Sequence, residues 1–166
     1  LDLDAHQGNG VCDIFESDPS LKIFDMYNGE IYPYEDHELR KRVDHNIPLQ
    51  YGTHGQIYLE ILQERLGPFL DGCQGAKLLI YNAGSDVIAG DRLGGLQLSK
   101  EHVLQRDLFV IEQARRRDMA VVFLPSGGYT DISYLLIADT ILNAADNCPY
   151  VPNVDQADAN TNKVGN

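Results

Sequence analysis

The chain opens with LDLDAHQGNG, Leu1–Gly10, and this stretch decides how the rest of the sequence is interpreted. On an extended strand, successive side chains point to opposite faces, so Asp2, Asp4 and His6 are expected on one face and the apolar residues on the other. Two carboxylates and an imidazole on one face are costly to bury unless a cation lies among them. The opening stretch therefore predicts a metal site.

Length, charge and hydropathy exclude several classes of function. The chain has 166 residues, enough for one domain, and 13 Lys+Arg against 25 Asp+Glu give a net charge of -12. Nucleic-acid binding is not expected, because phosphate neutralisation needs a basic face. The acidity suits basic partners, but it also serves solubility alone. No segment approaches the roughly 20 apolar residues of a membrane span, and no signal peptide is apparent, so we expect no membrane partner and a cytoplasmic location.

Apolar runs alternate with helical patterns along the chain. Continuous apolar runs, typical of strands in a sheet covered on both faces, occur at 21–26, 76–81 and 119–124. Helices are expected at 11–16, 54–70, 99–117 and 131–145. Shorter pieces are expected at 35–43, as a helical turn, and at 49–51, as an extended segment. Together with the opening strand, this order predicts an α/β fold: a parallel sheet with helices on both faces.

Two glycine-containing loops follow strands, at 82–95 and 125–130. Ligands of open α/β sheets bind at the carboxyl ends of the strands, where these loops lie. Asp4 and His6 supply an oxygen and a nitrogen that zinc accepts. Asp91 is the candidate third ligand, because neighbouring glycines let the backbone bend close to an ion. The spacing leaves open that Asp91 caps a turn and that Asp4 pairs with an arginine.

Other polar side chains have simpler explanations. The Tyr129 hydroxyl, after a Gly-Gly turn, can reach a developing oxyanion, but the chain has nine tyrosines and a surface position explains this one equally well. The remaining four histidines lie in polar segments and are expected in solvent: His37, His45, His54 and His102. The cysteines show no CxxC spacing, so we expect neither a zinc finger nor a disulfide framework.

Three segments, in order, resemble the site segments of zinc-dependent histone deacetylases. They are DLDAHQGNG at 2–10, YNAGSDVIAGDRLGG at 81–95 and SGGYTDISYLLIADTIL at 126–142. AHQGNG at 5–10 and FDMYNGEIYP at 24–33 are most similar to the class IV type. The resemblance covers residues 1–145 and implies the C-terminal portion of an arginase/deacetylase-like fold. Since Leu1 opens directly into a core strand, we expect the N-terminal part of that fold to be missing.

The resemblance also implies roles for individual residues. Asp4, His6 and Asp91 match the three zinc ligands of the family, and Tyr129 matches the tyrosine that polarises the substrate carbonyl. Asp2 matches the carboxylate that orients a catalytic histidine.

Further positions match a substrate contact and a second ion. Gly128 matches the glycine before the tyrosine, at the substrate. The main-chain carbonyls around Asp4 and His6, with Asp25 and Met26, match the surroundings of a structural K+ ion.

The implied reaction is hydrolysis of an N-acyl-lysine amide, with an acyl-lysine protein or an acetylpolyamine as substrate. Zn2+ would polarise the acyl carbonyl and acidify a bound water, and Tyr129 would donate to the oxyanion. The family's general base is a pair of adjacent histidines, and no His-His pair occurs in this sequence. We therefore expect little or no hydrolysis by this chain. The alternative is a non-catalytic metal-binding or interaction module.

The composition changes at Asp146, and residues 146–166 resemble a partial thrombospondin type 3 repeat. Asp158, Asn160 and Asn162 occupy alternating positions that can offer oxygen ligands to Ca2+. Amide oxygens carry no charge, so we expect weak Ca2+ affinity, and a flexible tail is the alternative. Such repeats are extracellular, which conflicts with the cytoplasmic expectation.

Overall fold

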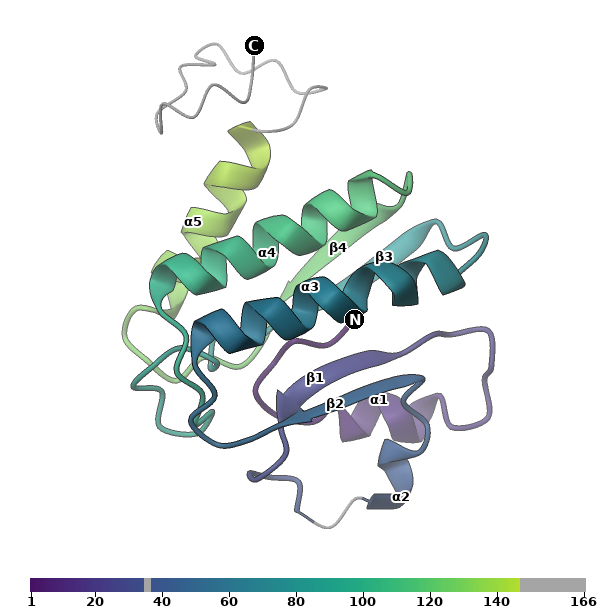
Figure 1. Ribbon diagram of the computed structural model, residues 1–166, viewed down its shortest axis with the longest axis horizontal. Helices are drawn as coiled ribbons and strands as arrows, with labels where there is room; N and C mark the ends of the chain where they lie inside the picture. The colour runs from purple at the N-terminus through teal and green to yellow at the C-terminus, as the bar shows by residue number, and fades with distance from the viewer. Residues whose placement is uncertain (35–36, 147–166) are drawn as a thin grey trace.

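The computed structural model of the chain describes residues 1–34 and 37–146 (Figure 1). Residues 147–166 lie outside this range, and they include the predicted calcium residues Asp158, Asn160 and Asn162. No helix in the described part is long and apolar enough to cross a membrane.

Strands and helices alternate as predicted. The strands are β1 (Phe24–Asn28), β2 (His45–Leu49), β3 (Leu78–Ala83) and β4 (Ala120–Pro125). The helices are α1 (Asn9–Ile14), α2 (His37–Arg40), α3 (Gly55–Gly72), α4 (Lys100–Arg115) and α5 (Ser133–Asp146). The sequence predicts only a short extended piece at 49–51, where the structure has the longer β2 beginning four residues earlier.

All strand pairs are parallel, and the opening stretch lies between them. β1 pairs with β2, and β3 pairs with β4. The Asp2 N–H donates to the Phe24 carbonyl at 2.8 Å, and the Leu3 N–H donates to the Asn82 carbonyl at 3.0 Å. The order across the sheet is therefore β2, β1, residues 1–3, β3, β4 (Figure 1).

The opening stretch leaves the sheet earlier than a simple strand would. The Asp2 carboxylate accepts from the Asp4 N–H at 3.1 Å, and the Asp4 carboxylate accepts from the His6 N–H at 2.8 Å. Such local bonds replace ladder bonds and turn the backbone. The prediction of a continuous strand is thus wrong beyond residue 3, although Asp2, Asp4 and His6 still line the same cleft.

Helices pack on both faces of β1. The Phe24 ring meets Phe69 of α3, with 5.3 Å between ring centroids. On the opposite face, Ile23, just before the strand, packs with Cys12 of α1. The main core lies between the sheet and α3, α4 and α5, and it includes the α3 residues Tyr58, Leu62 and Leu66. The predicted α/β architecture, a parallel sheet with helices, is confirmed.

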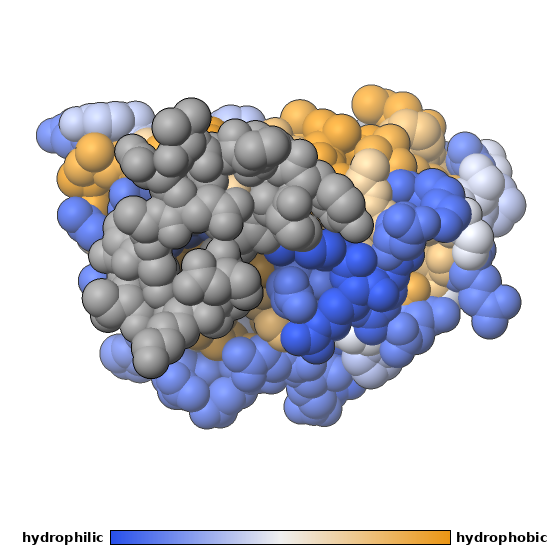
Figure 2. Space-filling view, turned by 90° about the horizontal axis from the view of Figure 1, so that it is seen from above, coloured by the Kyte–Doolittle hydropathy of each residue, from blue (hydrophilic) through white to orange (hydrophobic). Residues whose placement is uncertain are grey.

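The described helices cover only one face of β3 and β4. Tyr81 is buried and donates to Asp107 of α4, whereas the alternate side chains of these strands are exposed. These exposed apolar side chains are Leu78, Ile80, Val122 and Leu124. Seen from above, apolar surface gathers along one long edge of the molecule (Figure 2).

Two histidines predicted in solvent are half-buried. His45 stacks on Phe24, with 5.1 Å between ring centroids. His102 forms a capping box with Ser99: its N–H donates to Ser99 Oγ at 3.3 Å, and its Nδ1 accepts from the Ser99 N–H at 3.2 Å. Ser99 thus caps the N-terminus of α4. His54 is exposed, as expected, and the side chain of His37 lies outside the described part.

Candidate metal centre

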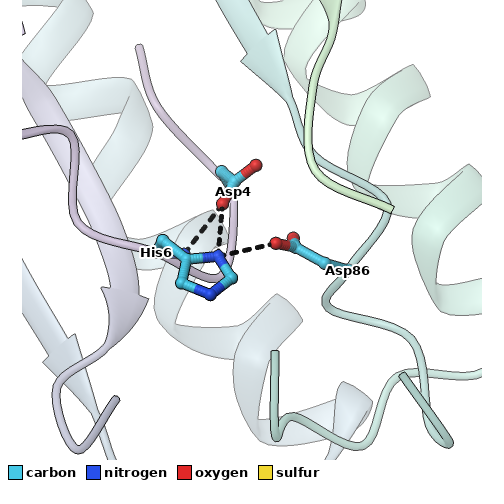
Figure 3. Close-up of side chains that lie close together, drawn as sticks. All are labelled: Asp4, His6 and Asp86. Carbon is cyan, nitrogen blue, oxygen red and sulfur yellow. Dashed lines mark hydrogen bonds and ion pairs between the residues drawn. The ribbon is translucent and has the colours of Figure 1, made fainter. Parts of the chain in front are cut away.

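Three side chains converge where the opening stretch leaves the sheet (Figure 3). His6 Nδ1 lies 3.1 Å from Asp4 Oδ1 and 2.8 Å from Asp86 Oδ2. One potential ligand atom from each residue lies within 4.8 Å of the others. Among the His, Cys, Asp and Glu side chains of residues 1–34 and 37–146, these three lie close enough together to hold a metal ion.

The third side chain of this cluster is Asp86, whereas the predicted ligand Asp91 lies outside it. Asp86 is fully buried, and its second oxygen accepts from the Ala5 N–H at 2.9 Å. The Asp91 carboxylate accepts backbone N–H groups instead, from Leu93 and Gly94 through Oδ1 and from Tyr129 through Oδ2. In the structure Asp91 has the turn-capping role that the spacing left open and holds the backbone of Tyr129. Its role as a zinc ligand stays a prediction.

The protonation of each of the three side chains depends on its hydrogen bonds to the others. Hydrogen bonds to Asp4, and then to Asp86, raise the pKa of His6 to about 10. Burial raises the pKa of Asp4, but hydrogen bonds from His6 outweigh it, so the pKa of Asp4 is lowered overall. Burial raises the pKa of Asp86. The His6 imidazolium is thus the cation that two buried carboxylates require, and a metal ion binding here would displace its proton.

Backbone groups and glycines leave room for these carboxylates and orient them. Asp4 Oδ2 accepts from the Gly127 N–H at 2.8 Å and from Ser126 Oγ at 2.9 Å. A Cβ on Gly84 would lie 2.3 Å from Asp4 Oδ2, and a Cβ on Gly127 would lie 2.3 Å from Asp86 Oδ2. One imidazole nitrogen and two oriented carboxylates form a donor set that suits zinc and leaves a fourth position for water or substrate.

We expect Gly127→Ala to destabilise the protein by about 1–3 kcal/mol, because the added methyl group overlaps the carboxylates of Asp86 and Asp4. Urea unfolding measures this change. Gly72→Ala is the matched control, since a Cβ there meets nothing within 4 Å. Equal stability of the two variants would contradict the tight approach of Gly127 to the site.

The candidate centre lies in a cleft of 670 Å³ at the carboxyl ends of the strands. Asp2, Asp4, His6 and Tyr129 all line it, so the structure brings these four predicted residues together. The aromatic, apolar and basic side chains among the other lining residues are Ile31, Tyr32, Tyr34, Tyr51, Arg92 and Leu93, and the neutral polar ones are Gln7, Asn9, Asn82 and Ser126. The cleft is therefore lined by acidic side chains and by several tyrosines.

Tyr129 stands beside the three-residue cluster. Its ring lies 6.2 Å from the His6 ring, edge to face, and its side chain is 48% exposed. Burial, followed by the charges of Asp86 and Asp4, raises the pKa of Tyr129, so its hydroxyl stays protonated and can donate. Gly128 is not among the residues that line the cleft, and its substrate contact stays a prediction. A Cβ there would lie 2.1 Å from Ser85 Oγ, so its small size serves packing.

A second pair of aspartates, one of which also lines the cleft, lies beside the cluster. Asp2 and Asp25 are buried, and Asp25 Oδ2 accepts from the Gly8 N–H at 2.9 Å and from Gln7 Nε2 at 3.3 Å. Among the described residues, Asp25 Oδ1 and Gln7 Oε1 are buried without a hydrogen-bond partner. Burial, and then the charge of Asp2, raises the pKa of Asp25 to about 8, and burial raises the pKa of Asp2 to about 6. The sequence pointed to Asp25 in two ways: it is an aspartate within the apolar run LKIFDM, and the resemblance places it in the surroundings of a structural K+ ion.

We expect Asp25→Asn to flatten the dependence of stability on pH. The pKa of Asp25 is raised in the folded state, so its stabilising contribution is complete below about pH 4 and is lost as the pH rises towards about 8. One such group changes the free energy of unfolding by at most about 1.4 kcal/mol per pH unit. Urea unfolding between pH 5 and 8 measures the slope, with the exposed Asp13→Asn as control. The same slope in Asp25→Asn and wild type would count against this assignment.

Comparisons with known proteins agree with this geometry. A model of the histone deacetylase domain matches residues 1–145. Histone deacetylase 2 of Arabidopsis thaliana is 42% identical over 143 residues, covering 86% of this chain and 36% of the relative. Histone deacetylase clr6 of Schizosaccharomyces pombe is 25% identical over 138 residues, covering 78% of this chain and 33% of the relative. The chain thus spans about a third of the length of these two curated relatives.

Solved structures share the fold. An acetylpolyamine aminohydrolase from Burkholderia pseudomallei superposes with a TM-score of 0.72 at 18% identity, over 87% of this chain and 43% of that one. A histone deacetylase homologue in complex with SAHA gives 0.70 at 23% identity, over 87% and 40%. Both structures show the arginase/deacetylase fold. With a family match over most of its length, the chain belongs to the histone deacetylase family.

Proposed function

We propose that this chain carries the metal centre of a zinc-dependent amide hydrolase of the class IV type, acting on N-acyl-lysine or on acetylated polyamines. The observation that carries the proposal is the convergence of Asp4, His6 and Asp86, with Asp4 and His6 lining one cleft together with Tyr129. The tyrosines that line the cleft suit the alkyl chain of such substrates and, in a polyamine, its free ammonium groups.

Each residue of the centre has a distinct task in the proposed reaction. Asp4, His6 and Asp86 would hold the ion, which supplies a Lewis acid for the acyl carbonyl and lowers the pKa of a bound water. The protonated hydroxyl of Tyr129 would donate to the carbonyl oxygen as negative charge develops on it. Asp91 accepts a hydrogen bond from the backbone N–H of Tyr129 and so holds the backbone from which the Tyr129 side chain extends.

The general base is the part of this mechanism that these 166 residues do not supply in the family's form. The sequence has no adjacent pair of histidines. We therefore propose little or no hydrolysis by the chain alone. The same observation favours a second candidate function, a metal-binding module without turnover.

We further propose a structural monovalent cation, such as K+, at the buried Asp2–Asp25 pair. The two unpartnered oxygens, Asp25 Oδ1 and Gln7 Oε1, support it, because buried acceptors without a donor are costly. Potassium chloride, compared with tetramethylammonium chloride, should then raise the free energy of unfolding at pH 8. Equal stability in the two salts would reject this ion site.

Zinc content and hydrolysis together test the main proposal. The purified chain should bind one equivalent of Zn2+. A chimera that adds the part of Histone deacetylase 2 not spanned by this chain should hydrolyse an acyl-lysine peptide or an acetylpolyamine. Zinc binding without turnover in the chimera would select the metal-binding module. A folded chain that binds no zinc would overturn both candidates.

A further inference from the structure

A buried arginine lies behind the metal centre, outside the cleft. Arg106 on α4 is fully buried, and its Nη1 donates to the Leu3 carbonyl at 3.1 Å and to the Gly84 carbonyl at 2.7 Å. Leu3 immediately precedes Asp4, and Gly84 lies two residues before Asp86. One guanidinium nitrogen therefore joins the two backbone segments that carry the candidate carboxylate ligands.

The neighbouring aspartate fixes the orientation of this guanidinium. Arg106 Nε donates to Asp107 Oδ1 at 2.8 Å, and the exposed fractions of the two side chains are 0% and 3%. The Tyr81 hydroxyl on β3 donates to the same carboxylate oxygen, and Thr140 Oγ1 on α5 donates to the other at 2.7 Å. Asp107 thus neutralises the buried charge and ties it to three elements, which leaves the planar guanidinium little freedom to move.

We propose that Arg106 is a positioning residue for the metal centre. It sets the separation of Asp4 and Asp86 by holding the carbonyls of Leu3 and Gly84, and Asp107 keeps it in place. Groups that orient metal ligands from behind affect metal affinity by about 10- to 100-fold. This inference rests on the proposed zinc function. It predicts that substitution of Arg106 changes the affinity for Zn2+, whereas substitution in an ion pair that only stabilises the fold would not.

Three substitutions in the full chain test this role. Arg106→Lys keeps the charge but lacks the planar fork that bonds Asp107 and both carbonyls. Thr140→Val removes one hydrogen bond to Asp107 and touches none of the candidate ligands. Arg117→Lys is the matched control. Arg117 also donates to a partly buried backbone carbonyl, that of Gly67, and forms an ion pair with Asp71, but it contacts neither of the segments that carry Asp4 and Asp86.

Zn2+ affinity by chelator competition and the visible absorption of bound Co2+ are the readouts, with thermal unfolding of the metal-free protein measured alongside. We expect Arg106→Lys to weaken Zn2+ binding by about 10- to 100-fold and to change the Co2+ spectrum. Thr140→Val should weaken Zn2+ binding by a smaller factor, and Arg117→Lys should leave affinity and spectrum unchanged.

The outcomes separate this inference from the proposed function. Wild-type protein that binds Zn2+, together with Arg106→Lys that binds it equally with an unchanged Co2+ spectrum, overturns the positioning role alone. Wild-type protein that binds no Zn2+ overturns the proposed function and this inference with it. If Arg106→Lys does not fold, Thr140→Val decides, and a folded Thr140→Val with wild-type Zn2+ affinity rejects the role.

Discussion

Replacing Asp86 by Asn is expected to weaken Zn2+ binding by more than about 100-fold, the upper range for substitutions that only support a ligand. The amide removes one of two carboxylate charges in the cluster and leaves His6 Nδ1 without one of its two anionic partners. Asp91→Asn should retain Zn2+ binding, because the Asp91 carboxylate faces backbone N–H groups and not the cluster.

Chelator competition at fixed pH measures both variants. Asp91→Asn should instead lower the free energy of unfolding by about 1–3 kcal/mol, because its carboxylate satisfies N–H groups of Leu93, Gly94 and Tyr129. The pair of variants thus distinguishes a ligand from a loop-holding residue. Loss of Zn2+ in Asp91→Asn with full retention in Asp86→Asn would reverse the assignment made from the structure.

Tyr129→Phe is expected to reduce kcat of the chimera by about 10²- to 10³-fold, the cost of removing one donor to a developing oxyanion. Its hydroxyl is protonated, because burial and nearby carboxylates raise its pKa, so it can donate at neutral pH. Zn2+ affinity should not change, since Tyr129 is not part of the ligand cluster.

Steady-state hydrolysis of an acyl-lysine peptide measures this effect, together with Zn2+ content. Tyr134→Phe is the matched control, because Tyr134 is 67% exposed on α5 and does not line the cleft. Unchanged kcat in Tyr129→Phe would remove Tyr129 from the reaction while leaving the metal centre intact.

The sequence by itself determined the class of fold and the region of the site. Apolar runs and helical spacing reflect burial on one or two faces, so the alternating order of strands and helices could be predicted. The general rule that ligands bind at the carboxyl ends of parallel strands predicted the edge of the sheet at which the candidate cluster lies. The similarity of the three motif segments to the family identified the family itself.

Only the tertiary structure decided which side chains meet. Asp86 and Asp91 share one glycine-rich loop, and composition and spacing do not show which carboxylate turns inwards. That choice depends on contacts distant in sequence: Asp86 bonds Ala5, whereas Asp91 bonds Tyr129. Arg106 joins Leu3 and Gly84 across 103 and 22 residues, a contact that no local pattern encodes.

The opening decapeptide combines both levels. Its alternating residues predicted a cation-binding cluster, because buried carboxylates need a positive charge nearby. Its conformation was not predictable from alternation, since the Asp2 and Asp4 side chains compete for backbone N–H groups and turn the chain out of the sheet. Residue types therefore specified the chemistry of the site, and packing between distant segments specified its geometry.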